Sequence, residues 1–152
     1  MVQTYHVVNA LAPTSDSLSG EKTTPAISMK DWDHLSFIIQ CGAGATGTSK
    51  ITVEGCDDTT PTNTEAIAFR YQECLTGDTF GELKQVGAVG FDTAAAANKM
   101  YKIEVDARDL PEDMSYVRLK AVEQVDSSVT AGIIAVLTNP RYAGAVVDSV
   151  LV

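Results

Sequence analysis

The segment MYKIEVD at positions 100–106 decides the fold class of this chain. After its first residue, apolar and charged residues alternate, and the apolar ones are Tyr101, Ile103 and Val105. A period of two places one face of an extended strand against a core and the other face in water, which is typical of antiparallel sheets. The segment therefore predicts a half-buried β-strand.

Similar patterns occur on both sides of this segment. Further strands are predicted at residues 2–8, 26–29, 35–41, 50–56, 66–72, 80–86, 116–122 and 133–137. The four residues 94–97 are the best candidate for a helical turn, and an isolated turn of that length is marginal. The chain is therefore expected to be all-β, an antiparallel β-sandwich or jelly-roll-like fold with about eight strands and little helix.

Neighbouring patterns suggest how two pairs of strands combine. Residues 35–41 and 50–56 flank a Gly-rich loop, which predicts a hairpin. Such a hairpin would let Cys41 and Cys56, at the ends of these strands, face each other. Residues 133–137 are apolar on both faces, which predicts a central strand covered on either side.

The second predicted pair joins the segment at 100–106 to the strand at 116–122 through a turn. Antiparallel pairing could place Glu104 and Asp106 across from Arg118 and Lys120. Opposite charges facing each other across a ladder contribute roughly 0.2–1 kcal/mol each and help to fix the register.

The chain is expected to form one domain over residues 1–152, with two unusual ends. Residues 9–25 are rich in Ser, Thr, Pro and Gly and predict a flexible loop or arm, which in a compact domain is typically functional. Residues 145–152 form an apolar tail. Either end could add to a neighbour's sheet. We favour an interaction role for the arm, and for the tail we favour folding back as one more core strand.

Composition narrows the classes of partner. The net charge of −9 argues against a nucleic-acid partner, whose phosphates are bound by Lys and Arg. No basic and apolar leader is visible at the N-terminus, and no apolar run approaches the roughly 20 residues that span a bilayer. We therefore expect neither a membrane nor a nucleic-acid partner, and a protein that is made in the cytoplasm and stays soluble there.

Motifs of catalysis and ligand binding are weak. Residues 42–47 match GxGxxG, but a strand pattern follows instead of the helix that would hold a pyrophosphate, so we interpret the motif as a hairpin loop. His34 beside Asp31 and Asp33 suggests a metal or acid–base site. A turn with so few ligands is more often ordinary polar surface.

Other candidate groups also favour structural interpretations. The Asp57-Asp58 pair lacks the regular ligand spacing of a calcium loop. Three cysteines without CxxC spacing favour buried free thiols over disulfides or a zinc site. The chain contains no GxSxG elbow and no P-loop. The sequence thus predicts no catalytic residue, no cofactor and no metal.

Candidate interaction residues lie in three places. Trp32, the single tryptophan, is either an interface anchor or a lid over one end of the core, and the sequence favours neither. The other two places are the arm and the corner near residue 140. The predicted contact residues are Pro13, Thr14, Leu18, Trp32, Arg141 and Tyr142.

A family resemblance adds to these observations. The block YVRLK at 116–120, residues 129–137 and the motif NPRYAG at 139–144 resemble the C-terminal half of small virion proteins of tailed bacteriophages. These proteins are typically encoded beside the major capsid protein and are known as head decoration or cement proteins. Residues 33–54 are similar as well. The likeness covers about residues 33–144 and leaves out the arm and the tail.

The resemblance implies a virion structural protein. Such a protein would decorate and stabilise the outer surface of an icosahedral capsid by bridging adjacent major capsid protein subunits, as a dimer or trimer. Two alternatives stay open: a tail-tube, tail-terminator or head–tail connector protein, and a carbohydrate-binding jelly-roll module. The resemblance includes no catalytic signature.

Overall fold

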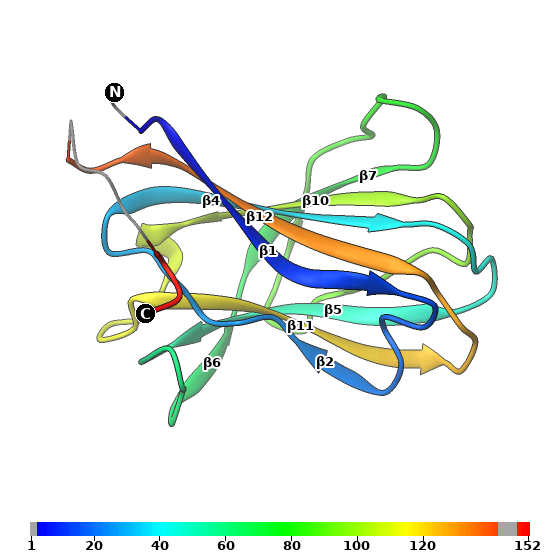
Figure 1. Ribbon diagram of the computed structural model, residues 1–152, viewed down its shortest axis with the longest axis horizontal. Helices are drawn as coiled ribbons and strands as arrows, with labels where there is room; N and C mark the ends of the chain where they lie inside the picture. The colour runs from blue at the N-terminus through cyan, green and yellow to red at the C-terminus, as the bar shows by residue number, and fades with distance from the viewer. Residues whose placement is uncertain (1–2, 143–148) are drawn as a thin grey trace.

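Two antiparallel sheets face each other in the computed structural model, which describes residues 3–142 and 149–152 (Figure 1). Sheet A runs, from edge to edge, β1 (Tyr5–Thr14), β12 (Ala131–Pro140), β4 (Trp32–Cys41), β10 (Met100–Asp106), β7 (Phe69–Cys74) and β8 (Lys84–Val86). Sheet B runs β2 (Glu21–Thr23), β11 (Tyr116–Val125), β5 (Thr48–Cys56) and β6 (Thr64–Ile67). Two short strands extend sheet B: β3 (Ile27–Ser28) pairs with β11, and β9 (Phe91–Asp92) pairs with β5.

The winding of the chain is that of a jelly roll. β1 lies beside β12 in sheet A, while β2 lies beside β11 in sheet B. β4 then adds to β12, and β5 adds to β11. The beginning and end of the chain therefore run together from one sheet to the other, which is the double winding of this architecture.

The predicted fold class is confirmed. The described residues contain twelve strands, of which eight have four or more residues and four have two or three. The helical content is one 3₁₀ turn, η1 (Ala107–Asp109), in the described part of the chain. Residues 94–97, the predicted helical turn, contain bends at 95 and 97 and no helix.

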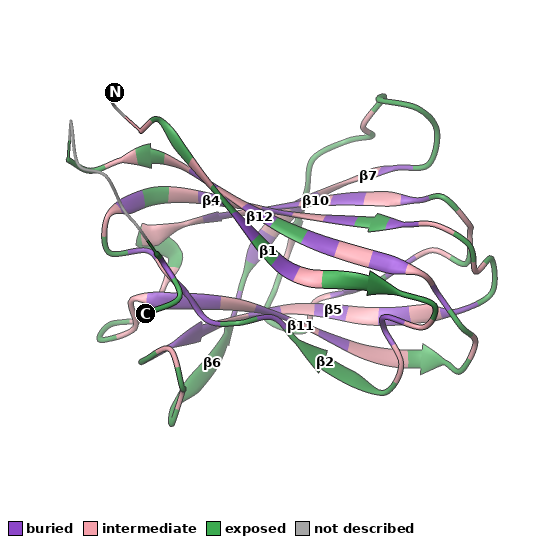
Figure 2. Ribbon diagram, in the orientation of Figure 1, coloured by how far each residue is buried: buried purple, intermediate pink, exposed green. Residues whose placement is uncertain are grey.

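Inward-facing side chains of both sheets form one core. In β10 the alternation read from MYKIEVD is confirmed, since Tyr101, Ile103 and Val105 are fully buried and the residues between them are partly exposed (Figure 2). Leu35, Phe37 and Ile39 of β4 are buried beside them. Burying each side chain of this size stabilises the fold by roughly 1.5–3 kcal/mol.

The predicted hairpin between residues 35–41 and 50–56 is wrong. β4 belongs to sheet A and β5 to sheet B, so Cys41 and Cys56 do not face each other, and all three cysteines are free and buried. The two strands bury their apolar faces in the same core from opposite sides, and the Gly-rich loop crosses between the sheets. A Cβ at Gly44 or Gly47 would lie 2.4 or 2.2 Å from a backbone oxygen of residues 127–128, so the loop requires glycine there.

The predicted pairing of residues 100–106 with 116–122 is also wrong. β10 lies in sheet A between β4 and β7, whereas β11 lies in sheet B between β2 and β5. Arg118 therefore pairs with Glu54 at 2.7 Å, and Lys120 pairs with Glu21 at 3.0 Å. The partners of Glu104 and Asp106 lie on sheet A instead.

The predicted strand at residues 66–72 is divided. The chain leaves sheet B after β6 and enters sheet A at β7, and Ala68 lies between the two strands. Ile67, Phe69 and Tyr71 all remain buried across this break. The sequence shows their common inward direction but not the change of sheet.

Residues 9–25 do not form an arm. Residues 9–14 continue β1, and residues 21–23 form β2. Between them Leu18 is buried in the core. Small residues such as Ala10 bury little surface, which explains why this segment resembles a loop in composition.

The tail turns back onto the domain at Val150. This residue is buried in the core, and its carbonyl oxygen accepts a hydrogen bond from the Ser28 amide at 2.7 Å. That contact supports the folded-back interpretation for this part of the tail, but residues 149–152 contain no strand, so the prediction of one more core strand is wrong there. Residues 145–148 of the predicted tail lie outside the described residues.

Candidate protein interface on sheet A

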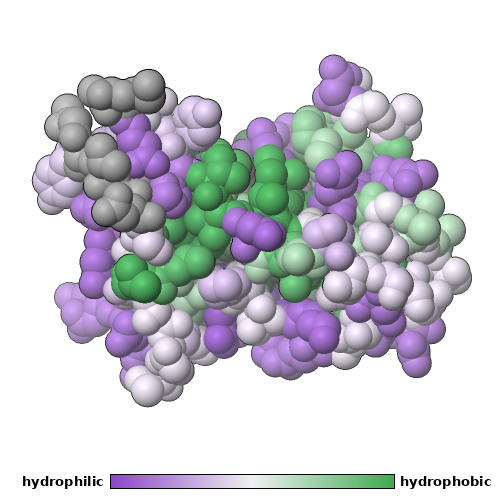
Figure 3. Space-filling model, in the orientation of Figure 1, coloured by the Kyte–Doolittle hydropathy of each residue, from purple (hydrophilic) through white to green (hydrophobic). Residues whose placement is uncertain are grey.

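The outer face of sheet A has an uncharged half, formed by β1 and β12. Neither ten-residue strand contains Lys, Arg, Asp or Glu. Val7 and Ile134 point outward and are 53% and 42% exposed. Figure 3 shows hydrophobic surface along β1 that continues toward the C-terminus.

β12 is an inner strand, as predicted, but it is covered on one side only. It lies between β1 and β4, with Ile133 in the core and Ile134 on the outer face beside Ile38 of β4. No described segment covers Ile134 from outside. Within the described residues, the outer side of β12 is therefore an exposed apolar surface.

The other half of the same face is charged and is centred on His34 of β4. The ring atom Nδ1 lies 2.7 Å from Asp106 Oδ1, and Nε2 lies 2.5 Å from Glu104 Oε2. Ser36 Oγ donates to Glu104 at 2.7 Å, and Arg70 donates to Asp106 at 2.8 Å. Cross-strand register explains the cluster, because Glu104 faces Ser36 and Asp106 faces His34 in the β10–β4 pair.

This geometry favours a protonated His34. An ionised carboxylate only accepts hydrogen bonds, so both ring nitrogens act as donors when both acids are charged. The hydrogen bond to Glu104 raises the pKa of His34 against the opposing effect of burial. Burial opposes ionisation of Glu104, but hydrogen bonds from His34 and Ser36 outweigh it and lower its pKa to about 2.

Ser36, His34 and Asp106 lie in the same spatial order as a Ser-His-Asp triad, with the imidazole in the middle, but the resemblance ends there. Ser36 Oγ lies 3.3 Å from His34 Nε2. A triad needs that nitrogen to accept the serine proton. Here Glu104 occupies the nitrogen as an acceptor and also takes the Ser36 hydrogen bond, so the imidazolium cannot act as a base toward Ser36. The cluster instead neutralises charge on the sheet surface.

Asp31 and Asp33, the acids next to His34 in the sequence, are not its partners in the structure. Asp33 pairs with Arg141 at 2.8 Å instead of closing a site around the imidazole. The actual partners lie 70 and 72 residues away in sequence. Their outward positions in MYKIEVD were visible, but the register that brings them to His34 was not. Within the described residues, no group of His, Cys, Asp or Glu is arranged to hold a metal ion.

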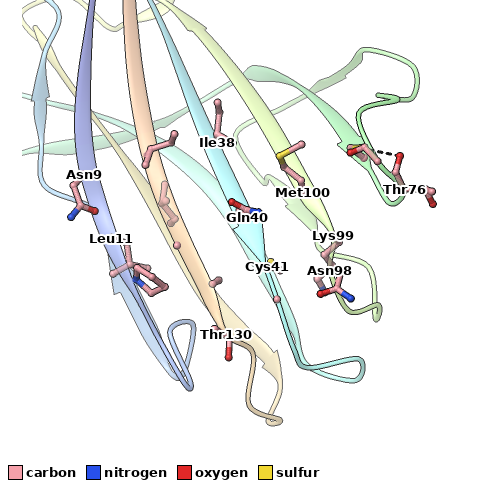
Figure 4. A pocket seen from close by; sticks show the side chains of 18 residues that line it. Asn9, Leu11, Ile38, Gln40, Cys41, Thr76, Asn98, Lys99, Met100 and Thr130 are labelled. Carbon is pink, nitrogen blue, oxygen red and sulfur yellow. Dashed lines mark hydrogen bonds between the residues drawn. The ribbon is translucent and has the colours of Figure 1, made fainter.

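A hollow of about 510 Å³ lies on the outer face between β1 and β7 (Figure 4). Its apolar walls come from Leu11, Ile38, Met100 and Ile134, and its amide and hydroxyl groups from Asn9, Gln40, Asn98 and Thr130. Gly132 forms part of the floor, where a Cβ would lie 3.4 Å from Pro13 Cδ. No aromatic side chain lines the hollow.

The predicted contact residues are divided between surface and core. Leu18 and Trp32 are buried, and Trp32 is only 1% exposed, so the interpretation of Trp32 as an anchor is wrong and the core interpretation holds. Its Nε1 finds no hydrogen-bond partner in the described structure. Neither residue can contact a partner without unfolding part of the domain.

The remaining four predicted residues are exposed but do not form one patch. Pro13 and Thr14 lie at the end of β1 that pairs with Ala131. Arg141 and Tyr142 follow Pro140, which pairs with Trp32 at the other end of β12. Nine steps along an extended strand separate the two ends by about 30 Å.

Comparison with known proteins leaves the family of this chain open. No family model matches the chain, and no curated protein matches it. One similar structure contains the CBM22-1 and GH10 modules of Clostridium thermocellum endo-1,4-beta-D-xylanase 10B with xylohexaose, at 12% identity and a TM-score of 0.41. The match covers 95% of this chain and 28% of that one.

A second similar structure is that of infectious bursal disease virus, Gx strain, at 12% identity and a TM-score of 0.25. It covers 90% of this chain and 42% of the viral one. This chain thus spans well under two thirds of either protein, and likenesses this distant carry no argument about function.

The described part of the chain contains no helix able to cross a membrane.

Proposed function

We propose that this protein is a virion structural protein that decorates and stabilises the outer surface of an icosahedral phage capsid. It would bridge adjacent major capsid protein subunits and, after synthesis in the host cytoplasm, reside on the outside of the virion. The observation that carries the proposal is the uncharged outer face of β1 and β12, beside a charge-neutralised cluster, in a chain of net charge −9.

Protein interfaces have this composition. Their centres are depleted in charged residues, while their rims are polar. Val7 and Ile134 would lie at such a centre, with the His34 cluster on one flank. A subunit that contacts two capsid proteins binds with an avidity that exceeds either contact alone, so modest contacts repeated over a lattice suffice to reinforce it.

Binding to empty heads tests this proposal. Empty heads are assembled from the major capsid protein of the same phage and mixed with the purified chain. Bound protein is measured by cosedimentation. We expect saturable binding that Ile134→Glu weakens by at least about tenfold, because a carboxylate would be buried without a partner. The same change at Val89, an exposed valine in the loop after β8, at the opposite edge of sheet A from β1, provides the matched control.

The proposal fails if the wild-type chain does not bind the heads, or if both glutamate variants bind as the wild type does. Stoichiometry distinguishes the tail-tube, tail-terminator or connector alternative. Hundreds of copies per particle support decoration, whereas a small multiple of six at one position supports a tail or connector part.

The hollow favours a second candidate, a carbohydrate-binding module, because amide and hydroxyl side chains ring it. Sugar sites usually also offer an aromatic platform, and the lining of this hollow has none. We therefore expect no hits on a glycan array. Hits that Gln40→Ala abolishes would favour the carbohydrate-binding function over decoration.

A further inference from the structure

In the described part of the chain, β1 is an edge strand that lacks the usual protection against pairing. Every second residue of an edge strand turns its backbone N–H and C=O groups away from the sheet, and natural edges are commonly blocked by charge or kept short. The other described edges follow that rule. β8 has three residues including Lys84, β2 has three including Glu21 and Lys22, and β6 has four including Glu65. β1 has ten residues and no Lys, Arg, Asp or Glu.

Only part of β1 has a regular register. It pairs residue for residue with β12 from Tyr5 to Asn9, and irregularities follow between Asn9 and Leu11 and between Leu11 and Thr14. Bulges bend a strand and increase its twist, which hinders further pairing. The segment that can accept another strand is thus 5–9, and Val7 is its middle residue.

The charge distribution indicates which strand would fit. A net charge of −9 opposes close approach of two copies over most of the surface. The β1 edge and its neighbour β12 form a region where two copies can meet without placing Lys, Arg, Asp or Glu side chains together. A strand paired antiparallel with its own copy is self-complementary around a twofold axis, the commonest symmetry of homo-oligomers.

We propose that two copies of this protein associate through antiparallel pairing of their β1 strands, with the twofold axis at Val7. Each Val7 then faces the Val7 of the other copy, and Tyr5 faces Asn9. The two A sheets become one continuous twelve-stranded sheet, whose uncharged strands occupy its centre. This dimer deepens the proposed function by locating the self-contact, but it is tested on the isolated protein, so its failure leaves capsid binding untouched.

Sedimentation velocity and light scattering give the first test. The wild-type chain should reach a dimer mass, twice the 16.1 kDa of the monomer, as concentration rises. Val7→Lys places two like charges opposite each other and should raise the dissociation constant by at least about tenfold. Val89→Lys, the same change on an exposed loop, should leave it unchanged. Circular dichroism verifies that both variants are folded.

Disulfide trapping tests the register. Facing residues in an antiparallel pair have Cα atoms roughly 4.5–5.5 Å apart, within the range of a disulfide. Val7→Cys should therefore form a covalent dimer on mild oxidation, and a mixture of Tyr5→Cys and Asn9→Cys proteins should form the mixed dimer. The native thiols are buried, and Val89→Cys serves as the control for random collisions.

Three results would overturn the proposal. The wild-type chain could stay monomeric at all concentrations, Val7→Lys could dimerise as well as the wild type, or Val7→Cys could crosslink no faster than Val89→Cys. A chain that is monomeric alone but shields β1 on capsids would assign this edge to the capsid protein instead.

Discussion

The two halves of the outer face of sheet A differ in charge, although both lie on the same kind of core. Under both halves the inner layer is the same kind of aliphatic core, with Ile133 below β12 and Ile103 below β10. Above this layer, β1 and β12 carry no Lys, Arg, Asp or Glu, whereas β4, β7 and β10 hold a network around His34. The core fixes the strands, so the composition of the outer surface can differ between its two halves.

The largest effect separates the inner layer from the outer one. Ile133→Ala should destabilise the protein by about 2–5 kcal/mol, because it leaves a cavity in the core. Ile134→Ala, one residue along the same strand, should cost less than about 1 kcal/mol, since the side chain is partly in water already. Urea unfolding of the two variants measures this contrast, and equal losses would mean that another part of the chain covers Ile134.

The next effect tests the charged half. Glu104→Ala removes an acceptor from both His34 and Ser36, so we expect a loss of about 1–3 kcal/mol in the free energy of unfolding. Glu104→Gln, which keeps the shape but not the charge, should recover part of that loss. An alanine variant as stable as the wild type would show that the network contributes nothing to the fold.

The pH dependence of stability sharpens the same comparison. The raised pKa of His34 makes its contribution complete below its ordinary pKa of 6.5 and lost as the pH rises through the raised value. Glu104 titrates at about 2 in the folded protein against 4.5 ordinarily, so its contribution is complete above pH 4.5 and disappears toward pH 2. Stability from the network should therefore be greatest between pH 4.5 and 6.5.

A control variant isolates the histidine in this profile. His34→Gln retains hydrogen-bonding capacity without titrating, so it should remove the fall in stability on the alkaline side. Melting temperatures across the pH range provide the measurement. A wild-type profile that stays flat from pH 6 to 9 would contradict an imidazolium between the two acids.

The smallest effect concerns the rim of the network. Arg108 lies 3.4 Å from Asp106 but is 81% exposed, and such ion pairs contribute little. Arg108→Ala should change stability by less than about 0.5 kcal/mol, while Arg70→Ala, with a shorter and less exposed contact, should cost somewhat more. Urea unfolding measures both losses in stability. A larger loss for Arg108→Ala than for Arg70→Ala would show that the exposed ion pair contributes more to the network than the less exposed one.

The sequence predicted directions better than partners. The alternation in MYKIEVD and in residues 116–122 identified which side chains face the core, because period and burial are local properties of a strand. It could not assign strands to sheets, because an alternating strand fits either side of the core equally well. Hairpin rules then joined β4 to β5, although the chain crosses between the sheets at that loop.

The same limit explains the candidate site. Several outward-facing acids in the sequence could have paired with Arg118. Its actual partner, Glu54, lies on β5, which the hairpin prediction had paired with β4 instead of β11. His34 met Glu104 and Asp106 through sheet register alone. Trp32 lies between two aspartates and is nevertheless buried. Successive residues of a strand point to opposite faces, so acidic neighbours do not indicate that the residue between them is exposed.

The double winding of the jelly roll has a consequence for biosynthesis. Tyr5 pairs with Thr138, a separation of 138 − 5 = 133 residues, so β1 leaves the ribosome long before β12, its neighbour in sheet A, exists. Contacts this distant in sequence slow folding. The nascent chain must therefore keep its first strand from premature association until the last third has been translated, and recovery from denaturant should be slow for a domain of this size.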